Sequence, residues 1–126
     1  MDKPSNMNGE SSVSKGSQSE NIACDFLVAK GYKIIKKNFH FGKTGEIDII
    51  AEDKGVLVFC EVKSKYKDAF GNPLEWITPK KQFKIRKVAE GYLYVNKIVD
   101  KDCRLDVIVI DFTVNPFKIE HLINAF

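Results

Sequence analysis

Hydrophobic residues recur at helical spacing in two segments of the chain. The first segment lies between Ser17 and Gly31, and its apolar stripe is Ile22, Ala23, Phe26 and Leu27. Ser17 and Glu20 match the S-x-x-E capping box and Gly31 is a typical stop, so we predict a helix here. The second segment follows Thr78 and Pro79, which predict a cap and a first helical position. Its apolar stripe is Ile85, Val88, Ala89, Tyr92 and Leu93.

The remaining apolar runs are short and rich in β-branched and aromatic residues, as strands are. Residues 32–41 carry lysines, which favours an edge strand. Residues 45–63 predict two strands joined by a tight turn at 53–55, and residues 103–112 and 117–123 predict two more. The predicted order is α-β-β-β-α-β-β, an α/β fold in one domain over residues 16–126. Residues 1–15 are serine-rich with little to bury, and we expect a disordered lead-in there.

The predicted hairpin brings acidic residues together. The run from Gly55 to Cys60 has no polar alternation, so we expect both its faces to be buried. Glu61 and Lys63 follow on one face, and antiparallel pairing through the turn brings Asp48 opposite Glu61. Two carboxylates beside an ammonium group favour a hard divalent cation with oxygen ligands.

Composition narrows the class of protein only moderately. The 126 residues carry a net charge of +3, which permits a nucleic-acid partner without requiring one. Cys24, Cys60 and Cys103 have no CxxC spacing and each lies in an apolar run, so we expect reduced core thiols. With no long apolar span or signal-like segment, we expect a cytoplasmic protein without a membrane partner.

Asp48 followed by Glu61-Val62-Lys63 resembles the PD-(D/E)XK nuclease motif. The wider pattern is similar to the YraN-like family of uncharacterised proteins, which resemble Holliday-junction resolvases. The matching positions are Gly16, Glu20, Ala23, Leu27, Gly31, Tyr32, Asn38, Gly45 to Asp48, Phe59, Glu61 to Lys63, Lys81, Gln82, Arg104, Asp106 and Val107. Cys60, Lys65 and Leu105 depart mildly from the family pattern. The resemblance covers the chain after the lead-in.

The resemblance implies a restriction-endonuclease-like α-β-β-β-α-β core, with a central mixed sheet flanked by helices. It implies that Asp48, Glu61 and the Val62 backbone carbonyl bind Mg²⁺ or Mn²⁺, and that Lys63 activates water or stabilises charge on the phosphate. The implied activity is metal-dependent hydrolysis of phosphodiester bonds in DNA, with branched DNA as the expected substrate. Symmetric cutting of a junction needs two sites, so a homodimer is expected too.

Several residues keep two interpretations at this stage. Glu46 is an outer metal ligand or a solvated strand residue, and Glu20 either reaches the site or only caps its helix. A set of lysines either contacts DNA or forms a solvated face: Lys65, Lys67, Lys80, Lys81 and Lys84. Gln82 either touches phosphate or water near the metal or is a surface helix residue. Tyr66 and Trp76 are candidates to stack on exposed bases, and for Trp76 the alternative is an anchor in the core.

Arg104 and Asp106 are expected to form a strand ion pair, whereas no role is expected for His40 or His121. Two other functions stay open beside the nuclease: a nucleic-acid-binding module with little or no turnover, and a structural adaptor.

Overall fold

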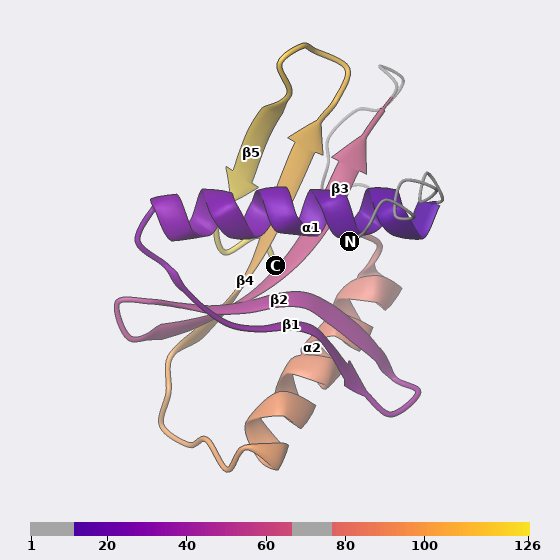
Figure 1. Cartoon of the computed structure of the whole chain (residues 1–126). Helices are drawn as coiled ribbons and strands as arrows, with labels where there is room; N and C mark the ends of the chain where they lie inside the picture. The colour runs from indigo at the N-terminus through magenta and orange to yellow at the C-terminus, as the bar shows by residue number, and fades with distance from the viewer. Residues whose placement is uncertain (1–11, 67–76) are drawn as a thin grey trace, which may run out of the picture.

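The computed structural model describes residues 12–66 and 77–126, with the backbone alone for 12–16. The order of elements is α-β-β-β-α-β-β, as predicted. The elements are α1 (Ser12–Ala29), β1 (Lys33–Phe41), β2 (Gly45–Asp53), β3 (Val56–Lys65), α2 (Pro79–Val95), β4 (Cys103–Asp111) and β5 (Lys118–Leu122) (Figure 1). Neither helix in these ranges has the length and apolar character that would let it cross a membrane.

The five strands form one mixed sheet in the order β1-β2-β3-β4-β5. Strands β3 and β4 are parallel and joined through α2, whereas the other neighbouring pairs are antiparallel. The two helices cover opposite faces of the sheet (Figure 1). Leu57 and Phe59 of β3 pack in the α2 cluster, and Val58 and Cys60 pack in the α1 cluster. The prediction that the run from Gly55 to Cys60 is buried on both faces is confirmed for Leu57 to Cys60, whereas Gly55 is exposed and Val56 half-buried.

The helix ends were predicted from local signals, with one error. Gly31 adopts a φ of +94°, and the Tyr32 N–H donates to the Leu27 carbonyl, so the predicted stop of α1 is confirmed. The Thr78 hydroxyl accepts from the Lys81 N–H at 3.2 Å, which confirms the cap of α2. The predicted capping box is wrong, because α1 begins at Ser12 and Ser17 lies inside the helix. Residues 12–15 of the expected lead-in are helical, and residues 1–11 lie outside the described residues.

The three thiols are free and differ in burial. Cys60 is a core thiol, as predicted, and Cys24 is half-buried. The prediction is wrong for Cys103, which is exposed, because it is the first residue of β4 and the buried run of that strand begins two residues later.

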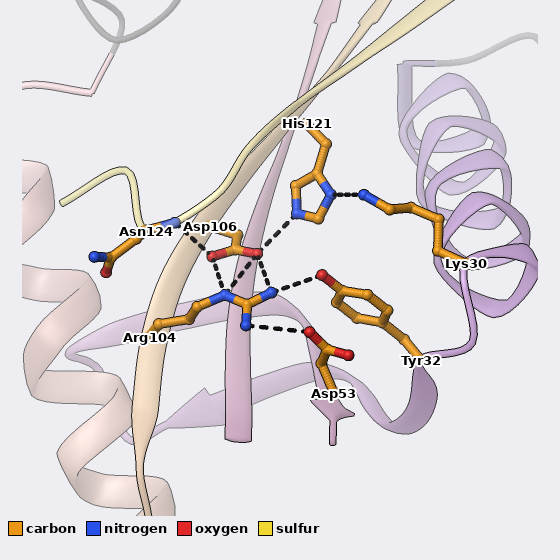
Figure 2. A network of polar contacts seen from close by, with 7 residues as sticks. All are labelled: Lys30, Tyr32, Asp53, Arg104, Asp106, His121 and Asn124. Atoms are coloured by element: carbon orange, nitrogen blue, oxygen red, sulfur yellow. Dashed lines mark hydrogen bonds and ion pairs between the residues drawn. The ribbon is translucent and has the colours of Figure 1, made fainter. Parts of the chain in front are cut away.

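A buried polar network extends from β4 and β5 to the turn of the β2–β3 hairpin (Figure 2). The Asp106 side chain is fully buried and accepts from Arg104 Nε at 3.1 Å and from the Asn124 N–H at 2.9 Å. Its Oδ2 also accepts from His121 Nε2 at 2.7 Å, and Lys30 Nζ donates to His121 Nδ1 at 2.8 Å. The predicted Arg104–Asp106 ion pair is confirmed. The prediction of no role for His121 is wrong, since its side chain is only 4% exposed.

The same network joins distant parts of the chain. Arg104 also donates to the Tyr32 hydroxyl at 2.6 Å and to Asp53 at 3.3 Å, so it links β4 to the end of α1 and to the hairpin turn. Burial alone would raise the pKa of Asp106. Hydrogen bonds from His121, the Asn124 backbone and Arg104 outweigh it and hold that pKa below its ordinary value.

We expect Asp106→Asn to destabilise the fold by about 3–5 kcal/mol at neutral pH, because it leaves Arg104 buried without its principal counter-ion. The pKa of Asp106 is depressed, so the stabilisation is present above the ordinary carboxyl pKa of 3.8 and is lost as the pH falls through the folded value. The difference between wild type and variant in urea unfolding should therefore narrow in acid. Asp102→Asn, at an exposed loop position, is the control. Equal losses for both variants would contradict this account.

Candidate active site

The β2–β3 hairpin has the register that the turn predicts. Its pairs run from Asp53–Val56 to Ile49–Cys60, and Lys54 and Gly55 take the positive φ values of 50° and 87° that the tight turn needs. The ladder ends one position before Asp48 and Glu61. Beyond it β2 bends away from β3 (Figure 1), and Asp48 Oδ2 accepts from the Val62 N–H at 2.8 Å. The Asp48 side chain thus bonds a backbone group on the edge of β3 that β2 has left.

Three carboxylates meet at this opening. Oxygens of Glu20, Glu46 and Asp48 lie within 4.8 Å of one another. Glu20 comes from α1, so of its two interpretations the one in which it reaches the site fits the structure. Glu46 also contacts His40 Nε2 at 3.2 Å, on the exposed side of the cluster. Carboxylate oxygens are the ligands that Mg²⁺ and Mn²⁺ prefer, so the donor set fits either metal.

Glu61 and Lys63 lie at the end of β3, on the face that α2 covers. Lys63 Nζ is 3.4 Å from Glu61 Oε2, and the side chains are only 21% and 14% exposed. Lys81 of α2 also reaches this pair, and a hydrogen bond from Lys63 lowers the pKa of the Lys81 amine. Burial lowers the pKa of Lys63, but its contacts with Lys81 and Glu61 outweigh this and raise it. The pair is therefore held beside a second basic residue from the helix.

The negative charges of Asp48 and Glu61 are only partly offset by the groups around them. Burial and the nearby Glu61 raise the pKa of Asp48 to about 8, although the hydrogen bond from Val62 opposes the shift. Burial also raises the pKa of Glu61, against the opposing charges of Lys63 and Lys81. A bound cation would offset the repulsion between the carboxylates of Asp48 and Glu61, which is a second reason that the cluster fits a divalent metal.

A pocket of about 130 Å³ opens beside the acids. Its charged lining comes from Glu46 and Glu61 on the sheet and from Lys81 and Lys84 on α2. Its acidic and basic walls match the opposite charges of a metal ion and a phosphate.

Among the described residues, the others that the sequence predicts to contact DNA do not line this pocket. Gln82 Nε2 donates to the Ile77 carbonyl at 3.1 Å, a bond that supports the start of α2. Lys80 is exposed on the same turn, and Lys65 lies opposite Asp111 at the end of β3. Tyr66 stacks on Phe112 with ring centroids 5.0 Å apart. Lys67 and Trp76 lie outside the described residues.

One positioning contact had no signal in the sequence. The hydroxyls of Ser19 and Ser64 are 2.5 Å apart, and Ser19 is buried. Ser19 precedes Glu20 on α1, and Ser64 follows Lys63 on β3. This bond between residues 45 positions apart therefore fixes the helix acid relative to the strand lysine.

We expect Asp48→Asn to stabilise the metal-free protein at pH 8 by at least about 1 kcal/mol. The pKa of Asp48 is raised from 3.8 to about 8 in the fold, so its stabilising contribution is present below pH 3.8 and is lost between pH 3.8 and 8. Urea unfolding with a chelator across this range measures the effect. Wild type should lose stability on the alkaline side, and the variant should lose less. Asp25→Asn, at an exposed position on α1, should leave the profile unchanged. A wild-type profile that rises towards pH 8 would contradict the raised pKa.

The chain is similar to a family of bacterial proteins over most of its length. Residues 19–110 match the model described as "Uncharacterised protein family UPF0102". A UPF0102 protein of Chlorobium phaeobacteroides is 44% identical over 117 residues, covering 88% of this chain and 92% of the relative. A UPF0102 protein of Clostridium novyi is 41% identical over 113 residues, covering 88% and 93%. Matches of this length and identity, which span the acidic site, establish that the chain belongs to the UPF0102 family.

Proposed function

We propose that this protein is a metal-dependent endonuclease that hydrolyses phosphodiester bonds in DNA, with branched DNA as its substrate. The observation that carries the proposal is the meeting of Asp48, Glu61 and Lys63 at one opening of the sheet, half-buried and beside a pocket lined by lysines of α2. Two acids and a lysine in this order along a β-hairpin match the nuclease motif that the sequence resembles.

In this proposal Asp48, Glu61 and the Val62 carbonyl hold Mg²⁺ or Mn²⁺, and Glu20 and Glu46 add two further carboxylates next to Asp48. Bound there, the metal would offset charge on the phosphate and lower the pKa of the attacking water. The hydrogen bond from Val62 fixes the orientation of the Asp48 carboxylate before any ligand arrives. Such pre-orientation lowers the entropic cost of assembling the site.

Lys63 has the geometry of a group that acts on the phosphate or on the attacking water. Its ammonium is held against Glu61 at 3.4 Å and its side chain is 21% exposed, so it is restrained and still partly accessible to solvent. In the proposal it orients water or stabilises the charge that develops on the phosphate oxygens. Lys81 and Lys84 line the pocket and hold the neighbouring phosphates of the DNA backbone.

We expect Glu61→Gln to abolish Mg²⁺- or Mn²⁺-dependent nicking of branched DNA while it preserves DNA binding. Gln keeps the shape of Glu and removes the charge that would hold the metal. Lys63→Ala should keep metal binding, seen by calorimetry with Mn²⁺, and lower the cleavage rate by about a hundredfold or more, because its role lies in the transition state. The measurement is a nicking time course on a four-way junction, a flap and a single strand.

Glu52→Gln is the matched control, because Glu52 lies on β2 near the turn, where it contacts Lys101 at 3.4 Å. It should cleave like wild type. A wild-type protein that binds these substrates but cuts none of them with either metal would replace the nuclease with the binding module. Cleavage by Glu61→Gln at the wild-type rate would show that the assigned site is wrong.

We also expect the start of α2 to contact the DNA backbone. Changing Lys80, Lys81 and Lys84 together to Ala should weaken binding and lower the slope of log affinity against log salt by up to about three. A matched triple variant changes Lys33, Lys54 and Lys97, three exposed lysines outside α2. It should keep the wild-type slope. Gel-shift titrations at several salt concentrations measure this slope for both triple variants. Equal slopes for the two variants would remove α2 from the DNA-binding surface.

A further inference from the structure

The two edges of the sheet are built differently. Strand β1 carries Lys33, Lys36 and Lys37 along its exposed length, and its pairing with β2 shifts register between Ile34 and Lys36. Asn38 adds a left-handed residue with a φ of +54°. Lysines and irregular backbone are the features by which proteins discourage another strand from pairing with an edge. The β1 edge is therefore protected against association.

The opposite edge, β5, has an apolar surface beside it. Strand β5 pairs with β4 alone among the described strands, and its other side faces outward (Figure 1). Between β5 and α1 lies a groove of about 320 Å³, lined by Ile22, Asp25, Phe26, Phe117 and Ile119. Phe117 is 41% exposed, and Val114 and Ile123, on either side of the strand, are 41% and 53% exposed. An open backbone edge beside apolar side chains is a surface suited to pairing with another strand.

We propose that a second copy of this chain occupies this edge, with β5 antiparallel to the β5 of the partner about a two-fold axis at Ile119. Opposite charges that face each other across the two strands favour this register. A two-fold axis at Ile119 brings Lys118 opposite the partner's Glu120 and, by symmetry, Glu120 opposite the partner's Lys118. An axis at Lys118 or at Glu120 would bring a residue opposite its own copy, with like charges directly across the strands, which is destabilising. The sequence of β5 is therefore self-complementary in one of these three registers.

The same register joins the apolar grooves of the two copies. Ile119 packs in the α1 cluster, so it lies on the face of the sheet that α1 covers. Pairing at Ile119 brings the two grooves, each with its Phe26 and Phe117, side by side along one strip. The contact would remove apolar surface from water and would pair the backbone groups of the β5 edge. Such a dimer would carry two equivalent acidic sites, although the pairing does not depend on their chemistry.

Sedimentation equilibrium of the full chain over a concentration series tests the proposal. Wild type should reach the mass of a dimer. Lys118→Glu alone and Glu120→Lys alone should each weaken the dimer by roughly tenfold or more, because each variant has like charges at both pairs. The double variant Lys118→Glu, Glu120→Lys exchanges the charges and should recover the wild-type affinity. Tyr94→Arg, at an 83% exposed position on α2, is the control and should dimerise like wild type.

A mixture of the two single variants gives the sharpest test. The Lys118→Glu chain is acidic at both positions and the Glu120→Lys chain is basic at both, so the mixture has opposite charges at both pairs. It should associate more tightly than either variant alone, which loss of folding cannot produce. A wild-type monomer at every concentration would overturn the proposal. So would a dimer whose affinity is the same in the single variants and in their mixture, because β5 would then not be its interface.

Discussion

The structure of this protein depends on where the β2–β3 hairpin opens. The strands pair from their tight turn as far as Ile49 and Cys60, both buried, and then diverge. Divergence leaves the Val62 N–H on the open edge of β3, and a buried backbone donor needs a partner. Asp48 supplies that partner at 2.8 Å. The bond that completes the strand therefore also directs a carboxylate into the opening, where Glu61 already lies.

Two buried acids near the hairpin differ in how far their charge is offset. On β4, beside Cys60, Asp106 accepts from Arg104, His121 and the Asn124 backbone, and its pKa is lowered. At the open end of the hairpin, Asp48 has one donor and several acidic neighbours, and burial raises its pKa to about 8. The hydrogen-bonded Asp106 stabilises the fold. Asp48 costs stability in the absence of a cation, as is common where a fold prepares a binding site.

Helix α1 and the residues that follow it contact both the acidic cluster and the Asp106 network. Its N-terminal half brings Ser19 to Ser64 and Glu20 to the acidic cluster. Its C-terminal end brings Lys30 to His121, and the following Tyr32 accepts from Arg104. Because one helix of 18 residues carries or adjoins both groups of contacts, each group restricts the position of α1 on the sheet. The sheet-facing stripe of α1 holds the helix in place, so the core on this face also sets the position of Glu20.

The sequence by itself determined the order of elements, the hairpin register and the nearness of Asp48 to Glu61, because alternation, helical periodicity and turn chemistry act over a few residues. It also predicted the cap at Thr78 and the stop at Gly31. Only the tertiary structure decided that Glu20 and Lys81 reach the site, that Ser19 bonds Ser64, and that His121 belongs to a buried network. These contacts join residues far apart in the chain, and they exist because two helices dock on opposite faces of one sheet. No local pattern specifies that docking, since it follows from how the whole apolar core packs.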